Sequence, residues 1–330
     1  ILKLVLYFFI LCEVILISFE HFTVALGTII PLFSLIMIGV FVGRMHWFTE
    51  KELGHINHMV FRLFFFVTMF YSLYNSNPGD ALHPRLLVFA FIALLSAYAV
   101  VFLLILFTEK DPRRKGTMIH CSSRSNFLLM AIPIATSLSV TGNIDITVMM
   151  MAVFVPVYNI LGVTAMEIFR GGKLRLVDLL LRICKNPMIL GAFFGFLFLQ
   201  LGIRIPQPIM KPLSQISAAT TPLALIILGA SFKWNRITGG LKQLITVISL
   251  KLILIPGIVF FAAIQMGSRG EEFIALIPVF ATPCAVATFV MAEEMNGDPE
   301  LAGNCVVYSS ALSCFTIFGW IIILKSLGIF

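Results

Sequence analysis

A short polar run interrupts an apolar segment of this sequence near residue 125. Arg124, Ser125 and Asn126 precede Pro133, and every residue between Asn126 and Pro133 is apolar. A proline within a helix removes one backbone hydrogen bond and clashes with the carbonyl one turn earlier, so we expect an interrupted helix here. The carboxamide of Asn126 can donate to a carboxylate or cap the broken helix. Arg124 can bind a carboxylate through paired hydrogen bonds or extend its charged end to water. The four residues together are candidates for binding a carboxylate.

A second apolar segment has a similar composition. It contains Thr282, Pro283 and Thr288 among small and apolar residues. Its threonines can contact a ligand or bond back to carbonyls of their own helix. A helix that restarts after a break presents an amino terminus with partial positive charge, which attracts carboxylates and phosphates. We therefore expect the two segments to meet at an anion-binding site, although Pro133 and Pro283 are also compatible with simple kinks in packed helices.

The composition indicates that the solvent for most of the chain is lipid. Hydrophobic residues make up 59% of the sequence and charged residues 12%, whereas soluble domains contain about 45–50% and about 25% respectively. A soluble protein of this size cannot bury so much apolar surface. Water-soluble enzymes, nucleic-acid-binding proteins and secreted disulfide-rich proteins are therefore excluded. The six cysteines lie in or beside apolar segments without a CxxC spacing, so we interpret them as buried apolar residues and expect no metal or cofactor.

Ten segments are long and apolar enough to cross a bilayer, which takes about 20 residues in a helix. Strands of a membrane barrel would alternate in polarity over about ten residues, and no segment shows that pattern. The predicted fold is therefore all-α and integral to the membrane, with backbone groups bonded inside each helix. The predicted spans are 22–43, 52–74, 85–107, 117–139, 146–169, 186–203, 209–232, 241–266, 272–295 and 302–327.

The spans divide into two sets of five around a polar stretch. We predict a first five-helix repeat at 21–170, a cytoplasmic loop at 171–185 and a second, inverted five-helix repeat at 186–330. Residues 1–20 form a possible extra N-terminal helix. An odd number of spans in each half gives the halves opposite orientations, which is the usual plan of secondary transporters that bind their substrate between the repeats.

Lysine and arginine residues in the short loops predict the orientation. Fourteen of them fall in loops on one face and four in loops on the other. Basic loops stay in the cytoplasm, so we expect an inner cell membrane location with both ends of the ten-helix unit outside. This placement explains the net charge of +7 without a nucleic-acid partner.

Four stretches of the sequence, in order along the chain, are similar to one family of permeases. They are 124–133 in the fourth span, 186–191 at the start of the sixth, 221–230 in the seventh and 288–302 at the end of the ninth. Each resembles the corresponding part of the auxin efflux carrier (PIN-like) family, and the likeness extends over residues 22–327.

The resemblance implies ten helices in two inverted repeats, with the fourth and ninth crossing at proline-containing breaks. It also implies a scaffold made of the first, second, sixth and seventh helices and a transport unit that moves as an elevator. Members carry organic anions, among them auxin and dicarboxylates such as malate or malonate, and a homodimer is the expected assembly. Family members commonly have a proline midway through the second helix. This sequence has none at residues 65–68, so we expect that helix to be straighter.

Further polar residues lie inside or at the ends of spans, where an ionisable group costs from about 2.5 kcal/mol upward. Asn159 can line the site or join neighbouring helices. Arg62 and Lys251 lie well inside their spans and are candidates for coupling, since a buried lysine can exchange a proton. Glu293 ends the ninth span as a gate, a proton relay or a solvated helix end. The histidines lie at span edges or in loops without an HExxH motif, so no metal site is expected.

The leading hypothesis is a secondary transporter of a small organic anion. The alternative is an ion-coupled exchanger or symporter of the related bile-acid or sodium–proton type. Sodium and proton exchangers of this shape place aspartates at the crossing, and the central turns of the fourth and ninth spans contain none. An enzyme acting within the bilayer would need a catalytic pair there, such as Ser with His or two Asp, and no such pair lies in mid-span. The expected partners are a small organic anion, the lipid bilayer and a second copy of the chain.

Overall fold

Every regular element in the described part of the chain is a helix. The computed structural model describes residues 30–75, 83–139, 142, 144–171, 176–232 and 240–330. The first helix is Ile30–Arg44, and two π-helical turns, Val60–Phe64 and Leu250–Leu254, join α2 to α3 and α11 to α12. The labelled helices are α2 (Glu50–Met59), α3 (Phe65–Tyr74), α4 (Pro84–Thr108), α5 (Pro112–Ser123), α6 (Phe127–Leu138), α7 (Asp145–Phe169), α8 (Leu176–Cys184), α9 (Pro187–Gln200), α10 (Gln207–Ser231), α11 (Leu241–Ser249), α12 (Ile255–Gln265), α13 (Gly270–Phe280), α14 (Ala287–Glu294) and α15 (Pro299–Ser326).

These helices coincide with the predicted spans. The predicted fourth span is the pair α5 and α6, and the ninth is the pair α13 and α14. Within the described residues, six helices are long and apolar enough to cross a membrane: Glu50–Tyr74, Pro84–Thr108, Asp145–Phe169, Gln207–Ser231, Leu241–Gln265 and Pro299–Ser326. The protein is therefore all-α and integral to the membrane.

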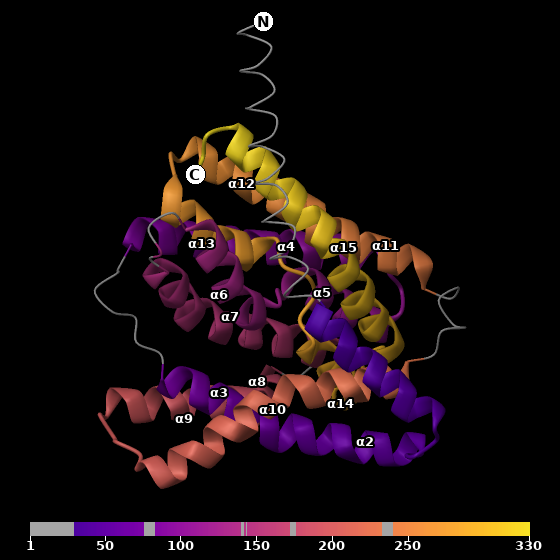
Figure 1. Ribbon diagram of the computed structural model, residues 1–330. Helices are drawn as coiled ribbons and strands as arrows, with labels where there is room; N and C mark the ends of the chain where they lie inside the picture. The colour runs from indigo at the N-terminus through magenta and orange to yellow at the C-terminus, as the bar shows by residue number, and fades with distance from the viewer. Residues whose placement is uncertain (1–29, 76–82, 140–141, 143, 172–175, 233–239) are drawn as a thin grey trace, which may run out of the picture.

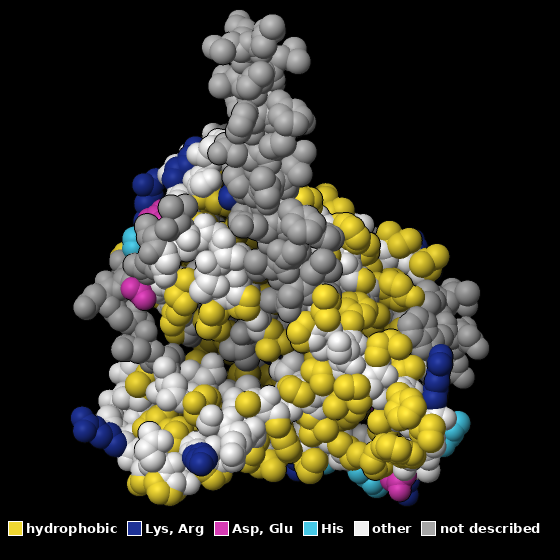
Figure 2. Space-filling view, in the orientation of Figure 1, with side chains coloured by type: hydrophobic (Ala, Val, Ile, Leu, Met, Phe, Trp, Pro, Cys, Tyr) yellow, Lys and Arg dark blue, Asp and Glu magenta, His cyan; other side chains and the backbone are white. Residues whose placement is uncertain are grey.

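The outer surface agrees with a lipid environment. Large apolar side chains cover much of the face seen in Figure 2. Phe107 on α4 is 82% exposed and Ile258 on α12 is 69% exposed. In water such a surface would be unfavourable, but in hydrocarbon it costs nothing.

Figure 1 shows the helices in two layers. α2, α3, α9 and α10 pack together in what we call the first layer, and α4 to α7 with α11 to α15 form the second layer. The main contacts between the layers are made by α7, which touches α3 and α9, and by α14, which touches α2 and α10. This arrangement brings the interrupted helices of the second layer against α3 and α10.

Paired glycines bring helices of the first layer close together. Gly191 and Gly195, four residues apart on α9, face the backbone of Phe66 and Phe70 on α3. A Cβ added at Gly195 would lie 3.0 Å from the Cα of Phe70, which is too close for an unshifted contact. Glycine is therefore needed at these positions because the backbones of the two helices approach closely, and not because the chain turns there.

The first helix uses the same device against α10. Gly39 and Gly43, again four residues apart, face the backbone of Ile226 and Ala230. Small residues with this spacing are typical of tightly packed membrane helices. The first helix of each predicted half thus packs through such a pair against the second helix of the other half.

The structure adds a helix to the predicted loop at 171–185. Helix α8 (Leu176–Cys184) occupies most of it. Its exposed side chains include Val177, Leu180 and Leu181, which is typical of a helix that lies along the membrane surface. In the sequence, this short apolar face lies among basic residues, so the segment reads as a polar loop. The extra helix proposed for residues 1–20 lies outside the described residues.

One prediction about helix shape is untested and another needs correction. The second helix contains the π-helical turn Val60–Phe64, and its straightness stays a prediction. The fourth span breaks before α6 begins, and Pro133 lies inside α6. The helix therefore continues through Pro133, and the polar run at Arg124 marks the interruption.

Candidate functional site

Two breaks in the chain meet inside the second layer. The first lies between α5 and α6, and the second lies between α13 and α14. Ser125 and Cys284 pair as an isolated antiparallel bridge, and the N–H of Asn126 donates to the carbonyl of Pro283 at 2.8 Å. The two interrupted segments identified in the sequence are therefore held together by their main chains.

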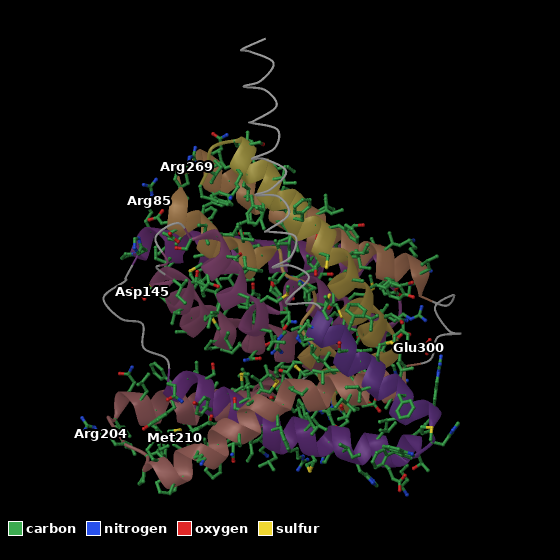
Figure 3. All side chains as sticks on the ribbon, viewed as in Figure 1. Arg85, Asp145, Arg204, Met210, Arg269 and Glu300 are labelled. Carbon is green, nitrogen blue, oxygen red and sulfur yellow. The ribbon has the colours of Figure 1, made fainter. Side chains whose placement is uncertain are left out.

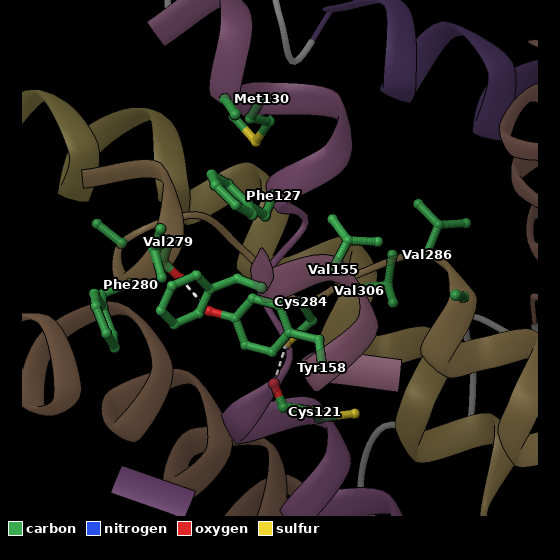
Figure 4. Packing of buried hydrophobic residues seen from close by; sticks show 14 of the residues in the cluster. Cys121, Phe127, Met130, Val155, Tyr158, Val279, Phe280, Cys284, Val286 and Val306 are labelled. Carbon is green, nitrogen blue, oxygen red and sulfur yellow. Dashed lines mark hydrogen bonds between the residues drawn. The ribbon is translucent and has the colours of Figure 1, made fainter. Parts of the chain in front are cut away.

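Pro283 leaves a carbonyl free at this crossing. A proline has no N–H, so the carbonyl of Val279, four residues earlier, lacks its helical partner. The hydroxyls of Ser125 and Tyr158 both donate to this carbonyl. The bond from Tyr158 is 2.6 Å long and is drawn in Figure 4. The sequence analysis did not select Tyr158. The one feature of the sequence that could have indicated Tyr158 is that the hydroxyl of a tyrosine inside an apolar helix needs a hydrogen-bond partner.

Lys251 reaches the crossing from the π-helical turn between α11 and α12. Its side chain is 2% exposed, and its ammonium group donates to the hydroxyl of Ser125. Pro256 cannot bond the carbonyl of Leu252, and this carbonyl instead accepts the indole N–H of Trp320 at 3.0 Å. The irregular turn that positions Lys251 is thereby fixed to α15.

The Arg124 side chain also stays inside the protein. It is 7% exposed, and its Nη1 lies 3.3 Å from Sδ of Met291 and 3.5 Å from Nε2 of His120. This burial contradicts the alternative in which Arg124 extends to water. His120 is itself fully buried. Among the described residues, no carboxylate pairs with Arg124 or Lys251.

A cavity lies between the crossing and the first layer. Its volume is about 50 Å³, room for a few water molecules at about 10–15 Å³ each. The amino-terminal ends of α6 and α14 both line it. The Nδ2 group of Asn126 is buried without a partner among the described residues. No Asp or Glu is among the lining residues, which are Phe65, Thr68, Met69, Arg124, Ser125, Asn126, Phe127, Leu129, Val155, Tyr158, Thr220, Thr221, Ala224, Ala285, Val286 and Ala287.

Threonines of the first layer, which the sequence analysis missed, form the opposite wall. The hydroxyls of Thr68 on α3 and Thr220 on α10 are 2.6 Å apart, and Thr221 lines the cavity beside them. They supply hydroxyl groups without charge. Ser309 of α15 accepts the N–H of Cys284 at 3.0 Å and supports the break from the other side.

Thr282, Thr288 and Asn159 are fully buried but do not line the cavity. The hydroxyl of Thr282 donates to the carbonyl of Pro278 at 2.8 Å, which is the back-bonded alternative. The hydroxyl of Thr288 has no partner among the described residues. Asn159 donates to Sδ of Met69 at 2.7 Å, so its side chain joins α7 to the first layer.

The remaining candidates lie away from the crossing. Arg62 is exposed on its helix, and Glu293 lines a separate pocket. The neighbouring Glu294 makes the contact between layers instead, because its carboxylate lies 2.7 Å from Nδ1 of His58 on α2.

Comparison with known families decides the class of the protein. The family described as membrane transport protein matches residues 24–177 and 173–321. The chain belongs to this family. The resemblance to auxin efflux carriers is thereby confirmed, and membership identifies a membrane transporter and not an enzyme.

Relatives of this transporter include proteins from bacteria, archaea and plants. It is 20% identical over 307 residues to a Rhizobium meliloti protein named "Putative malonate transporter", covering 91% of this chain and 96% of the relative. It is 25% identical over 159 residues to an uncharacterized transporter of Methanocaldococcus jannaschii, with 47% and 52% covered. It is 23% identical over 147 residues to auxin efflux carrier component 1 of Arabidopsis thaliana, with 43% and 24% covered.

Proposed function

We propose that this transporter moves a small organic anion and holds it where the two interrupted helices meet. The observation that carries the proposal is the chemistry of the crossing cavity. Asn126 offers an unpartnered amide donor, Arg124 is buried at the cavity wall, and Lys251 is bonded to a residue that lines it. The amino termini of α6 and α14 add partial positive charge. These donors favour a carboxylate and disfavour a cation.

We propose a short carboxylate or dicarboxylate as the substrate class. The name of the Rhizobium relative supports malonate as the first compound to test. A dicarboxylate would place one carboxylate near Asn126 and the helix termini, and the hydroxyls of Thr68 and Thr220 would lie on the opposite wall. Charged hydrogen bonds of this kind are the stronger ones in proteins.

The proposal includes an elevator movement of the second layer against the first. The first layer is held by backbone-close glycine contacts, as expected for a rigid scaffold, while the cavity lies between the layers. The equivalent use of Gly39 with Gly43 and of Gly191 with Gly195 supports two inverted five-helix repeats. Binding sites between such repeats are exposed to each side of the membrane in turn.

We further propose that the basic loops face the cytoplasm. Arg85 and Arg269, two of the few cations in the other loops, lie at one edge of the molecule in Figure 3, and Glu300 lies at the opposite edge. The carboxyl-terminal end of α10, at Ser231 and Phe232, lines the same pocket as Glu300. The proposed membrane is the inner cell membrane, with both ends of the ten-helix unit outside.

Uptake of labelled malonate into proteoliposomes tests the proposal. Replacing Asn126 with Ala removes the free donor and should lower uptake by at least about tenfold, since a hydrogen bond to a charged group contributes about 1.5–3 kcal/mol. The matched control is Asn75→Ala, because Asn75 is exposed at the end of α3.

Uptake by Asn126→Ala equal to that of the unchanged protein would refute the binding site. The ion-coupled exchanger is distinguished in the same vesicles. It requires that uptake follow an imposed sodium or pH gradient and vanish without one, whereas the anion permease transports malonate down its own gradient.

A further inference from the structure

A second pocket lies between the two layers, next to the crossing cavity. Its volume is about 320 Å³, and it is lined by α2 and α10 from the first layer and by α14 and α15 from the second. Along α10 it begins at Ile227, three residues after Ala224 of the crossing cavity. No residue lines both pockets, so the second one is a separate place on the protein.

Two buried carboxamides line this pocket without the partners they need. Asn304 on α15 is 7% exposed, and its side chain lines the pocket without a hydrogen bond to a described residue. Asn57 on α2 is 1% exposed. Its Nδ2 donates to the carbonyl of Val290 and to the carboxylate of Glu294, whereas its Oδ1 has no partner within the described chain. Buried polar groups are normally bonded. Two such groups from opposite layers therefore indicate that something polar occupies the space between them.

The charge of the pocket indicates what that occupant is. Glu293 and Glu300 line it together with Glu50, and the lining residues that the structure describes include no Lys, Arg or His. The crossing cavity has the opposite character, with Arg124 and no carboxylate. Carboxylates and carboxamide oxygens accept hydrogen bonds and attract cations. A second carboxylate substrate would be repelled here.

We propose that this pocket is a second ligand site, for a small organic cation that carries primary ammonium groups. Its volume far exceeds the roughly 10–15 Å³ that a single water-sized occupant needs, so one dehydrated inorganic ion would leave most of the lining unbonded. A primary ammonium group has three donors, enough to bond a carboxylate and a carboxamide oxygen together. A four-carbon diamine can place one such group near each layer.

Occupancy of the site would affect movement between the layers. Its acceptors come from both sides, Asn57 from the first layer and Glu293 and Asn304 from the second. A cation bonded to both would hold the layers together and inhibit transport. This consequence depends on the proposed elevator, whereas binding of the cation does not.

Equilibrium dialysis of the purified full chain with labelled butane-1,4-diamine tests the site. We expect saturable binding that the neutral isostere butane-1,4-diol does not displace. Asn304→Leu and Glu293→Gln should each weaken binding at least tenfold. Glu272→Gln is the matched control, because Glu272 pairs with His83 outside this pocket, and it should bind as the unchanged protein does. Asn126→Ala should also retain binding, which separates this site from the anion site.

Several outcomes would overturn the proposal. One is the absence of saturable diamine binding to folded protein. Another is equal affinity in Asn304→Leu, Glu293→Gln and the unchanged chain. A third is displacement of the diamine by sodium or magnesium chloride beyond the effect of potassium chloride at the same ionic strength, which would identify an inorganic cation as the ligand. Loss of binding in Asn126→Ala would place the diamine in the crossing cavity instead.

Discussion

The ammonium group of Lys251 donates a hydrogen bond to the hydroxyl of Ser125, two residues before Phe127, where the fourth helix restarts. The same hydroxyl donates to the carbonyl that Pro283 leaves free in the ninth helix. One buried side chain from α11–α12 is thus connected to both interrupted helices. This connection places a positive charge beside the cavity without exposing the charge to lipid.

We predict that Lys251→Met abolishes most anion uptake. A hydrogen bond that involves a charged group contributes about 1.5–3 kcal/mol. Losing the Lys251 ammonium group should therefore lower substrate affinity or transport rate by at least about tenfold. The measurement is malonate uptake into proteoliposomes containing equal amounts of monodisperse protein. Lys242→Met is the control, because Lys242 is exposed at the start of α11. Full uptake by the Lys251 variant would exclude this residue from the anion site.

A second prediction concerns the stability of the crossing. Tyr158→Phe leaves the carbonyl of Val279 with Ser125 as its remaining hydroxyl partner and should lower the free energy of unfolding by about 1–2 kcal/mol. Thermal unfolding in detergent, followed by tryptophan fluorescence, measures this change. Tyr308→Phe is the control, since the hydroxyl of Tyr308 has no hydrogen-bond partner among the described residues, and it should leave the unfolding temperature unchanged. Equal unfolding temperatures for both variants would show that the Tyr158 bond contributes nothing.

The sequence predicted the positions of the helices well because each span must satisfy its backbone inside lipid. It also predicted which two segments are interrupted, and it selected Arg124, Asn126 and Lys251. It placed the interruption of the fourth helix just after Arg124, as observed, but it expected Pro133 to break the helix, which instead continues through this proline. A proline removes one backbone hydrogen bond wherever it occurs in a helix. Whether the helix is interrupted there depends on the segment that packs against it.

The threonine wall and Tyr158 were beyond sequence reasoning for a different reason. Thr68 and Thr220 are 152 residues apart in the chain but have hydroxyls 2.6 Å apart. Threonines in apolar helices usually bond to the backbone of their own helix. The presence of two threonines in the sequence therefore does not indicate that they share a cavity. The same holds for Asn57 and Asn304, whose common pocket depends on how the layers pack.

A third prediction tests the close packing of the first layer. A Cβ at Gly191 would lie 3.1 Å from the Cα of Phe66 on the neighbouring helix. Gly191→Ala should therefore force α9 and α3 apart and destabilise the protein by about 1–3 kcal/mol. Gly319→Ala on α15 is the control, since a Cβ there meets nothing within 4 Å. The readout is thermal unfolding of both variants, and an unchanged Gly191 variant would mean that this contact is loose.

The last prediction tests movement between the layers directly. The carboxylate of Glu294 on α14 lies 2.7 Å from the imidazole of His58 on α2, so cysteines at these positions can be joined by a short bifunctional thiol reagent. In a background in which the exposed Cys184 is replaced by Ser, the doubly substituted protein should transport before cross-linking, stop after it and recover when the cross-link is reduced. Each single-cysteine variant, treated identically, controls for the reagent itself. If the layers do not move against each other during transport, the cross-linked protein will carry malonate as fast as the reduced protein does.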